Sequence, residues 1–529
     1  MILLDEIKPG DTYNRLGTAN TSASLPEPET ETKDRSSLDD DRDLEGSVTS
    51  VELEAAAAPQ DPNIVDWDGP DDPANPHNWS RARKGGTIAL VSAITFVTPL
   101  ASSIFSPSIE QVMTEFNSTN QELASFIVSV YLLGYCFGPL VVAPLSEVYG
   151  KNPIYNVCNV LFVVWNVACA KAPNIGALII FRFFAGLAGC CPLTLGAGSL
   201  ADITTPEHRA AAMSGWVMGP ILGPVVGPIA GGYLTEAKDW RWSFWVVSMV
   251  GGLIVILGFL FMRETGANAL LEQKAKRLRK ETGNPKLTSR LDTGVATKEL
   301  FKIATIRPGK MLLFSPIILC LSLYMAIVYG YLYLLFTAIP TVFETQYGFT
   351  IGQVGLSYLG FGVGSMVGVG ITGATSDRIS QWLTKKNSGK AKPEYRLPIM
   401  AMGSVFVPGG LFMFGWTVQN HDHWILPIIG TSLVGLGMMA GFMSMSISVY
   451  LVDAYTAHAV SAIAASTVFR SLLGALLPIG GRKMSEALGL GWGASLLAFI
   501  AVVMVPISGL LMKFGEKIRH YMIFNVKIE

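Results

Sequence analysis

Twelve apolar segments, each long enough to cross a bilayer, constrain the fold of this chain more than any other feature. About 20 apolar residues at a helical rise of 1.5 Å span the hydrocarbon core of a membrane. Such segments lie near residues 86–108, 123–145, 153–171, 176–201, 209–235, 241–262, 309–341, 350–374, 397–418, 424–451, 457–480 and 486–512. Only 15% of the 529 residues are charged, whereas soluble domains carry about 25%. We therefore expect an all-α membrane protein with twelve transmembrane helices.

Polar stretches separate these segments into two groups of six. Residues 1–75 are rich in Asp, Glu, Ser and Pro, and such a composition cannot bury enough apolar surface to fold alone. The stretch 263–308 is basic, with Lys274, Lys276, Arg277, Arg279 and Lys280 clustered at helical spacing. We predict a disordered tail over 1–75, a six-helix half over 76–262, a basic cytoplasmic loop over 263–308, a second half over 309–512 and a tail over 513–529.

The distribution of Lys and Arg predicts the orientation in the membrane, because short cytoplasmic loops are enriched in these residues. If both termini are cytoplasmic, the cytoplasmic segments from Arg81 onward carry 27 of them and the opposite segments carry five. We expect a multi-pass protein of the plasma membrane, with a vacuolar or other internal membrane as the alternative. Asn117 begins the tripeptide Asn-Ser-Thr in the first outer loop and is a candidate glycosylation site.

The fifth apolar segment contains a ladder of glycines at every fourth position, with a proline after three of them. Its residues are Gly215, Gly219, Pro220, Gly223, Pro224, Gly227, Pro228 and Gly231. At about 100° per residue a four-residue step drifts by about 40°, so the glycines share one helix face. Such a face lets a neighbouring backbone approach closely, and the prolines are expected to bend the helix. A generic close-packing surface is the alternative interpretation.

This ladder resembles a family motif. Residues 223–232, Gly-Pro-Val-Val-Gly-Pro-Ile-Ala-Gly-Gly, are similar to the antiporter motif of drug:proton antiporters of the major facilitator superfamily. Residues 143–151, 182–202, 239–242 and 393–398 agree with this resemblance, which extends from Trp67 to Arg519 and is closest to fungal twelve-helix members. It implies two pseudo-symmetric six-helix bundles, proton antiport, and a role for Gly219, Pro220, Gly223, Pro224, Gly227, Pro228, Gly231 and Gly232.

An internal repeat supports the two related halves that this fold requires. Ala143 and Glu147, closing the second segment, match Gly373 and Asp377, closing the eighth. The first copy is similar to a cytoplasmic latch of the family, which implies a gating role for Glu147, Gly150, Lys151, Asp202, Asp377 and Arg378. The chain departs from the family pattern at Ala143, Glu147 and Asn152, which favours a weaker latch. Lys151 is expected to pair with Asp202.

Two arginines, Arg182 and Arg470, lie inside predicted helices. A charge at membrane depth costs at least about 2.5 kcal/mol and usually faces a cavity or a partner. Arg182 matches the arginine of the family's fourth-helix motif, so the resemblance implies a role in proton coupling, and we extend this hypothesis to Arg470. The alternative for both is a structural arginine bonded to backbone carbonyls. No carboxylate falls at a predicted midplane, which disfavours cationic polyamines and favours neutral, aromatic or weakly anionic substrates.

Aromatic and methionine side chains are the candidates for binding the substrate. In the family, spans one, four, seven and ten line the central cavity. The candidates are Tyr324, Tyr329, Tyr331 and Tyr333 of the seventh span and Met439 and Met443 of the tenth. Tyrosines suit stacking and hydrogen bonding with flat molecules, and thioethers suit adaptable binding. Packing or lipid contact is the alternative for both groups.

The sequence contains no pattern of a catalytic, cofactor or metal site. His421 and His423 flank Asp422 without a further ligand pattern, and no Gly-rich loop ends in Lys-Ser or Lys-Thr. The net charge of −1 carries no nucleic-acid signature. We predict a monomeric transporter in the lipid bilayer that exports a xenobiotic or fungal secondary metabolite by proton antiport through alternating access. A transporter of polyamines or other solutes, uptake, and a nontransporting receptor of the same fold stay open as alternatives.

Overall fold

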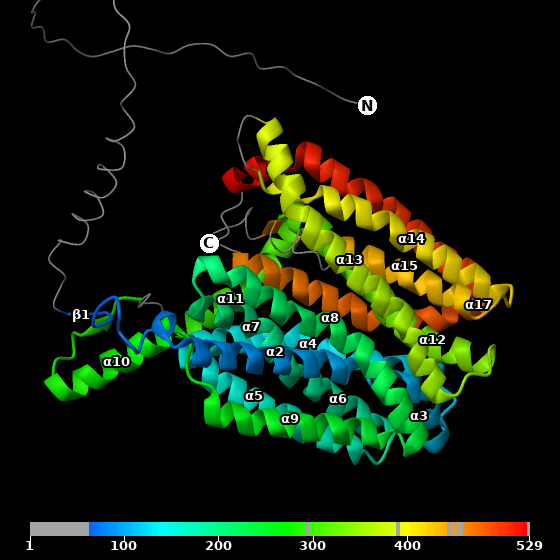
Figure 1. Ribbon diagram of the computed structural model, residues 1–529, viewed down its shortest axis with the longest axis horizontal. Helices are drawn as coiled ribbons and strands as arrows, with labels where there is room; N and C mark the ends of the chain where they lie inside the picture. Colours follow the sequence, from blue (N-terminus) through cyan, green and yellow to red (C-terminus); the bar gives the residue numbers. More distant parts are fainter. Residues whose placement is uncertain are drawn as a thin grey trace, which may run out of the picture. The chain divides into compact units, whose positions relative to one another are not determined.

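The computed structural model of the protein describes residues 63–291, 297–387, 392–441, 447, 450–451 and 459–525. These residues form a bundle of long helices, with one short two-stranded sheet beside it (Figure 1). Among them, eleven helices are long and apolar enough to cross a membrane, and α15 adds a shorter apolar helix. The predicted all-α fold with twelve transmembrane helices is confirmed.

The helices follow the chain as two groups of six. The first group is α2 (Arg81–Ser103) with η2 (Ser106–Ser108) and α3 (Ile109–Glu115), α4 (Gln121–Tyr149), α5 (Lys151–Ala170), α6 (Ile175–Gly189) with α7 (Cys191–Ile203), α8 (Pro206–Ala237) and α9 (Arg241–Phe261). The second is α12 (Pro316–Thr345), α13 (Ile351–Lys386), α14 (Pro398–Gln419), α15 (Ile425–Gly441) and α17 (Ala459–Asn525), which is two helices meeting at Gly489. The remaining elements are β1 (Ile64–Val65), η1 (Pro76–Asn78), α10 (Ala267–Thr282), β2 (Thr288–Ser289), α11 (Thr297–Phe314) and η3 (Pro393–Arg396).

The boundaries differ from the predicted ones where a local signal overrides hydropathy. The seventh transmembrane helix begins at Pro316 rather than near residue 309, because the Ser315 hydroxyl accepts a hydrogen bond from the Ile318 amide and caps α12. The last two spans meet at Gly489, whose φ of 78° is open to glycine at little cost. The last helix continues to Asn525, beyond the predicted end at residue 512.

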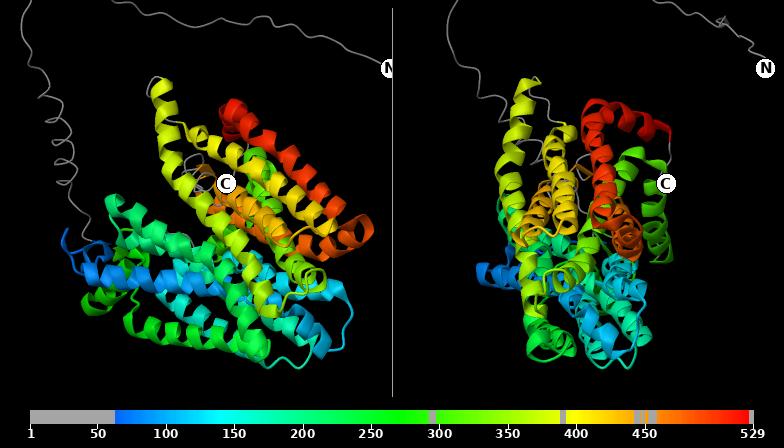
Figure 2. Two further views of the ribbon diagram at one scale, coloured as in Figure 1. Left: turned by 45° about the vertical axis from the view of Figure 1, so that its right-hand side comes forward. Right: turned by 90° about the vertical axis from the view of Figure 1, so that its right-hand side faces the viewer.

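The helices of the two groups converge toward the end of the bundle that carries α3 and diverge toward the end that carries α10 (Figures 1 and 2). We call these ends the α3 end and the α10 end. Between the two groups, α8 packs against α13 and α4 packs against α17, so each contact joins one half to the other. At the α10 end α11 contacts both α4 and α17.

The segment that precedes α2 is folded together with the connection between the halves. Strands β1 and β2 pair in parallel, with Val65 opposite Ser289, and Val65 is buried with Ala275 and Leu287. The Lys274 ammonium donates to Asp68 at 2.6 Å. Residues 63–75, which the sequence analysis placed in the tail, therefore contain an ordered strand, and the predicted loop 263–308 contains two helices and a strand.

Ion pairs stabilise the small extramembrane unit that β1, β2 and α10 form. Arg290 donates to the Asp66 carboxylate at 2.5 Å. Burial raises the pKa of Asp66, but hydrogen bonds from Arg290 and the Trp67 amide outweigh burial and hold the pKa below its ordinary value. The carboxylate is therefore ionised at neutral pH, and its stabilising contribution is lost only in acid, as the pH falls through that lowered pKa.

The predicted glycine stripe of α8 lies against the backbone of α2. A Cβ atom on Gly219 would lie 2.9 Å from the Phe96 nitrogen, and one on Gly223 would lie 2.9 Å from the Phe96 oxygen. Gly227 and Gly231 meet the backbone near Ile104 in the same way, whereas Gly215 has nothing within 4 Å. The close approach of a neighbouring backbone is confirmed for four of the five glycines.

The contact between α8 and α2 predicts a position-specific effect of adding one methyl group. A Cβ on Gly231 would overlap the Ile104 carbonyl, so Gly231→Ala should separate the helices and cost about 1–3 kcal/mol of stability. Gly215→Ala is the matched control, because it adds the same group to open space and gains helix propensity. Thermal unfolding of the two variants in detergent measures the difference; equal midpoints would contradict this account of the stripe.

Candidate functional site

Arg182 lies in the interior of the first half, on α6, with 1% of its surface exposed. Its Nε donates to the Ile127 carbonyl at 2.7 Å, and one terminal nitrogen donates to the carbonyls of Ser102 at 3.0 Å and Val128 at 3.3 Å. The guanidinium carbon lies 5.1 Å from the centre of the Phe105 ring. Backbone carbonyls and aromatic faces thus solvate the charge in place of water.

The break at the end of α2 explains why a carbonyl is available to Arg182. The last carbonyls of a helix lack intrahelical partners, and α2 ends at Ser103. The hydroxyls at this break reach the second half: Ser102 Oγ lies 2.9 Å from the Tyr333 hydroxyl, and Ser106 Oγ lies 2.9 Å from the Tyr358 hydroxyl. Arg182 therefore binds the segment through which α2 contacts α12 and α13.

Two pairs of tyrosines lie near the two intramembrane arginines. Tyr131 and Tyr135 of α4 have ring centres 5.1 Å apart, and Tyr329 and Tyr333 of α12 have ring centres 5.3 Å apart. Arg470 of α17 lies 4.9 Å from the centre of the Tyr329 ring. The structure thus brings Arg470 to one of the predicted substrate-binding tyrosines.

The other predicted cavity residues differ in their surroundings. The Tyr324 hydroxyl is buried and has no hydrogen-bond partner among the described residues. Tyr331 instead donates to the Leu497 carbonyl of α17 at 2.9 Å, so its hydroxyl is engaged within its own half. Met439 is buried on α15, and Met443 lies outside the described residues.

The predicted gate residues are only partly brought together. Lys151 and Asp202 form the expected ion pair at 2.6 Å, with side chains 20% and 25% exposed. Gly150 adopts a φ of 92° at the turn between α4 and α5, which explains the glycine there. Glu147 is exposed and Arg378 is exposed on α13, whereas the side chain of Asp377 is outside the described part of the chain.

Glu264, which the sequence analysis missed, holds this turn. Its carboxylate accepts hydrogen bonds from the amides of Lys151 at 3.0 Å and Asn152 at 2.9 Å, the first residues of α5, and from that of Gly266 at 2.8 Å. A carboxylate at a helix N-terminus satisfies free amides and opposes the helix dipole. In the sequence, the one signal for this role was an acidic residue directly after the sixth apolar segment. The α5 amides that it binds lie more than a hundred residues earlier in the chain.

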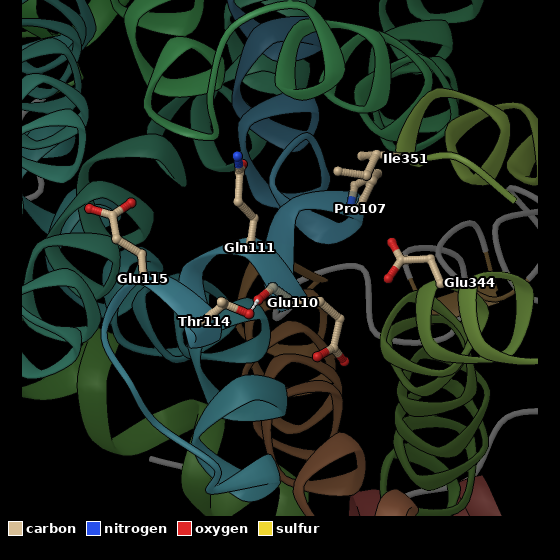
Figure 3. Close-up of a pocket in the computed structure, with 7 residues that line it drawn as sticks. All are labelled: Pro107, Glu110, Gln111, Thr114, Glu115, Glu344 and Ile351. Atoms are coloured by element: carbon tan, nitrogen blue, oxygen red, sulfur yellow. Dashed lines mark hydrogen bonds between the residues drawn. The ribbon is translucent and has the colours of Figure 1, made fainter. Parts of the chain in front are cut away.

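A pocket of about 480 Å³ lies at the α3 end between the two halves (Figure 3). It is lined by Pro107, Glu110, Gln111, Thr114, Glu115, Glu344 and Ile351. Glu110 comes from α3 and Glu344 from α12, so carboxylates of both halves reach it. One Glu344 oxygen is buried without a hydrogen-bond partner in the described residues. Glu115 is neutralised by Arg241 at 2.7 Å.

Polar contacts join the halves around this pocket. The Gly352 amide at the start of α13 donates to Glu236 of α8 at 3.0 Å. Lys483 of α17 forms an ion pair with Glu122 at the start of α4. The α3 end is thus held closed by contacts from two helices of the first half, α4 and α8. Asn117, the predicted glycosylation site, is exposed between α3 and α4 at this end.

A bundle of two six-helix halves, with a buried arginine in the first half and a seal at one end, defines the class as a multi-pass membrane transporter. A family model for the Major Facilitator Superfamily matches residues 91–478, and the chain belongs to this superfamily. It is 58% identical over 460 residues to the MFS-type transporter penM of Penicillium rubens, covering 87% of this chain and 90% of that one. It is 50% identical over 494 residues to the efflux pump radE of Floropilus chiversii, covering 93% and 91%.

A solved structure has the same fold. The xylose transporter XylE from E. coli, in a partially occluded inward open conformation, matches with a TM-score of 0.61 at 16% identity, covering 82% of this chain and 98% of that one. The predicted resemblance to the superfamily is therefore confirmed, and the relatives are transporters rather than enzymes.

The contacts of Glu264 predict that neutralising it loosens the turn between α4 and α5. Hydrogen bonds to a charged group contribute about 1.5–3 kcal/mol, so Glu264→Gln should lower the unfolding midpoint. Glu272→Gln is the control, because Glu272 pairs with Lys276 and Arg279 on α10, where exposed ion pairs contribute about 0–1 kcal/mol. Thermal unfolding of both variants tests this, and an equal shift for the two would show that Glu264 has no special role.

Proposed function

We propose that this transporter exports small organic molecules, such as a xenobiotic or a fungal secondary metabolite, by proton antiport through alternating access. The observation that carries the proposal is the position of the glycine ladder. One end of α8 packs on the backbone of α2, and a Cβ on Gly232 would lie 2.7 Å from the Ile351 carbonyl of α13. The stretch that resembles the antiporter motif therefore packs on α2 and borders α13 of the other half at Gly232. The 50% identity to a protein named an efflux pump supports export.

The proposed orientation in the membrane determines which end of the bundle accepts the substrate. The Lys and Arg distribution favours cytoplasmic termini in the plasma membrane, so the α10 end would face the cytoplasm and the α3 end the outside. In that orientation the closed α3 end corresponds to an inward-facing state, ready to accept substrate from the cytoplasm. Asn117 would then lie on the outer surface, where glycosylation occurs.

Arg182 and Arg470 are proposed to couple proton movement to the rearrangement of the halves. Arg182 binds the carbonyl of Ser102, whose hydroxyl bonds to Tyr333 across the interface. A change at that interface is therefore passed to Arg182 through one residue. Arg470 lies 4.9 Å from the centre of the Tyr329 ring, which itself packs on Tyr333.

Substrate and gate residues complete the proposal. Tyr324, Tyr329 and Tyr333 with Met439 and Met443 are proposed to contact the substrate, and we leave out Tyr331 because its hydroxyl is bonded to α17. Lys151 and Asp202, with Glu147, Gly150, Asp377 and Arg378, are proposed to close the cytoplasmic end once substrate has bound, before it is released on the other side.

Accumulation of labelled compounds in cells tests this function. Cells with the transporter should retain less of a substrate than cells without it, and the difference should grow as the external medium is acidified. Arg182→Gln should reduce export by at least about tenfold, because the buried charge and its fork of donors are lost. Arg277→Gln, an exposed residue of α10, should export normally.

Each other outcome is informative. No difference for any compound in a broad panel would favour a receptor over a transporter. A difference that ignores the pH gradient would contradict proton antiport while leaving export intact. Normal export by Arg182→Gln would assign Arg182 a purely structural role.

A further inference from the structure

A groove between α2 and α9 lies at the α10 end of the first half, away from the interface between the halves. Its volume is about 500 Å³, within the range of about 300–1,000 Å³ that is usual for small-ligand sites. None of the residues proposed above for substrate binding, gating or coupling lines this groove, so it has no assigned role. Leu260 and Phe261 line it and are 70% and 67% exposed, which places it on the lipid-facing surface.

Small residues on one face of α2 create the groove. Ala82, Gly86, Ala89 and Ala93 recur at helical spacing and line one side. A Cβ on Gly86 would meet nothing within 4 Å. Ile254 and Leu257 of α9 contribute to the other side. Because these four α2 residues are small, the two helices leave an apolar channel between them.

Two arginines line the same groove. Arg83 and Arg263 are both exposed, one at the start of α2 and one just after the end of α9. Arg83 lies 5.6 Å from the centre of the Trp79 ring, which fixes its position. Neither arginine forms an ion pair with a carboxylate within the described residues. The site thus combines two uncompensated guanidiniums with an apolar channel.

We propose that this groove binds an anionic glycerophospholipid from the adjoining leaflet. Arg83 and Arg263 bind the phosphate and headgroup, since guanidinium groups match phosphate oxygens geometrically, and one acyl chain occupies the channel. Basic pockets between transmembrane helices on the cytoplasmic side suit anionic lipids, and the Lys and Arg distribution favours that side here. A second copy docked here with two-fold symmetry would bring the same arginines face to face, so charge favours the lipid.

Native mass spectrometry of the purified full-length protein tests the proposal. Delipidated protein in detergent is titrated with phosphatidylserine or, separately, with phosphatidylcholine. We expect one phosphatidylserine to bind with at least about tenfold higher apparent affinity than phosphatidylcholine. The double variant Arg83→Gln and Arg263→Gln should lose that preference. Ala89→Leu, which fills the channel without a change of charge, should weaken the binding of both lipids.

Matched controls separate the groove from general surface effects. Arg277→Gln removes an exposed charge of α10 outside the groove, and Val503→Phe adds bulk at a residue that is 75% exposed; both should bind lipid as the wild type does. Unchanged thermal midpoints show that the groove variants are folded. Equal affinity for the two lipids, or groove variants that bind as the wild type does, would overturn the proposal. A dimer that Ala89→Leu dissociates would instead make a second copy the occupant.

Discussion

The charge of Arg182 has to be solvated inside a membrane, and much of the first half is arranged to do so. Three carbonyls from α2 and α4 accept its hydrogen bonds, at 2.7 to 3.3 Å. One of them is free because α2 ends there, so the break in α2 and the arginine require each other. The hydroxyls at the same break, on Ser102 and Ser106, form the contacts with α12 and α13. A single buried cation thus links the packing of one half to its contact with the other.

This arrangement bears on the proposed proton coupling. The hydrogen-bond partners of Arg182 are backbone carbonyls, which do not titrate, so in the proposed antiport a protonation event would reach the guanidinium through movement of α2 rather than through loss of an ion pair. The carboxylates that reach the interface lie instead at the α3 end, where Glu110 and Glu344 line one pocket from opposite halves. Separating the halves exposes both to water. The absence of acids at the predicted midplane is consistent with this division of roles.

The sequence predicted the features that depend on local patterns. The twelve helices follow from apolar length, and the close approach of α8 to α2 follows from glycines every fourth residue. Contacts between distant residues were beyond such patterns: the strand at Val65 pairs with residues more than two hundred positions away, in a segment whose polar composition indicated disorder. Glu264 was missed for the same reason, and spacing along a helix could not reveal that the Tyr331 hydroxyl donates to the Leu497 carbonyl of α17.

The contacts that close the α3 end are weak enough to be reversible. The hydrogen bond from the Gly352 amide to the Glu236 carboxylate contributes about 1.5–3 kcal/mol, because the acceptor is charged. An exposed ion pair such as Lys483 with Glu122 contributes about 0–1 kcal/mol. The seal is therefore worth a few kcal/mol, in addition to the close approach of α8 and α13. Reversing a two-state equilibrium from 1:99 to 99:1 takes about 5.5 kcal/mol. A ligand that binds one state more tightly than the other can supply a difference of that size, whereas a large apolar interface at the same place would lock the transporter in one state.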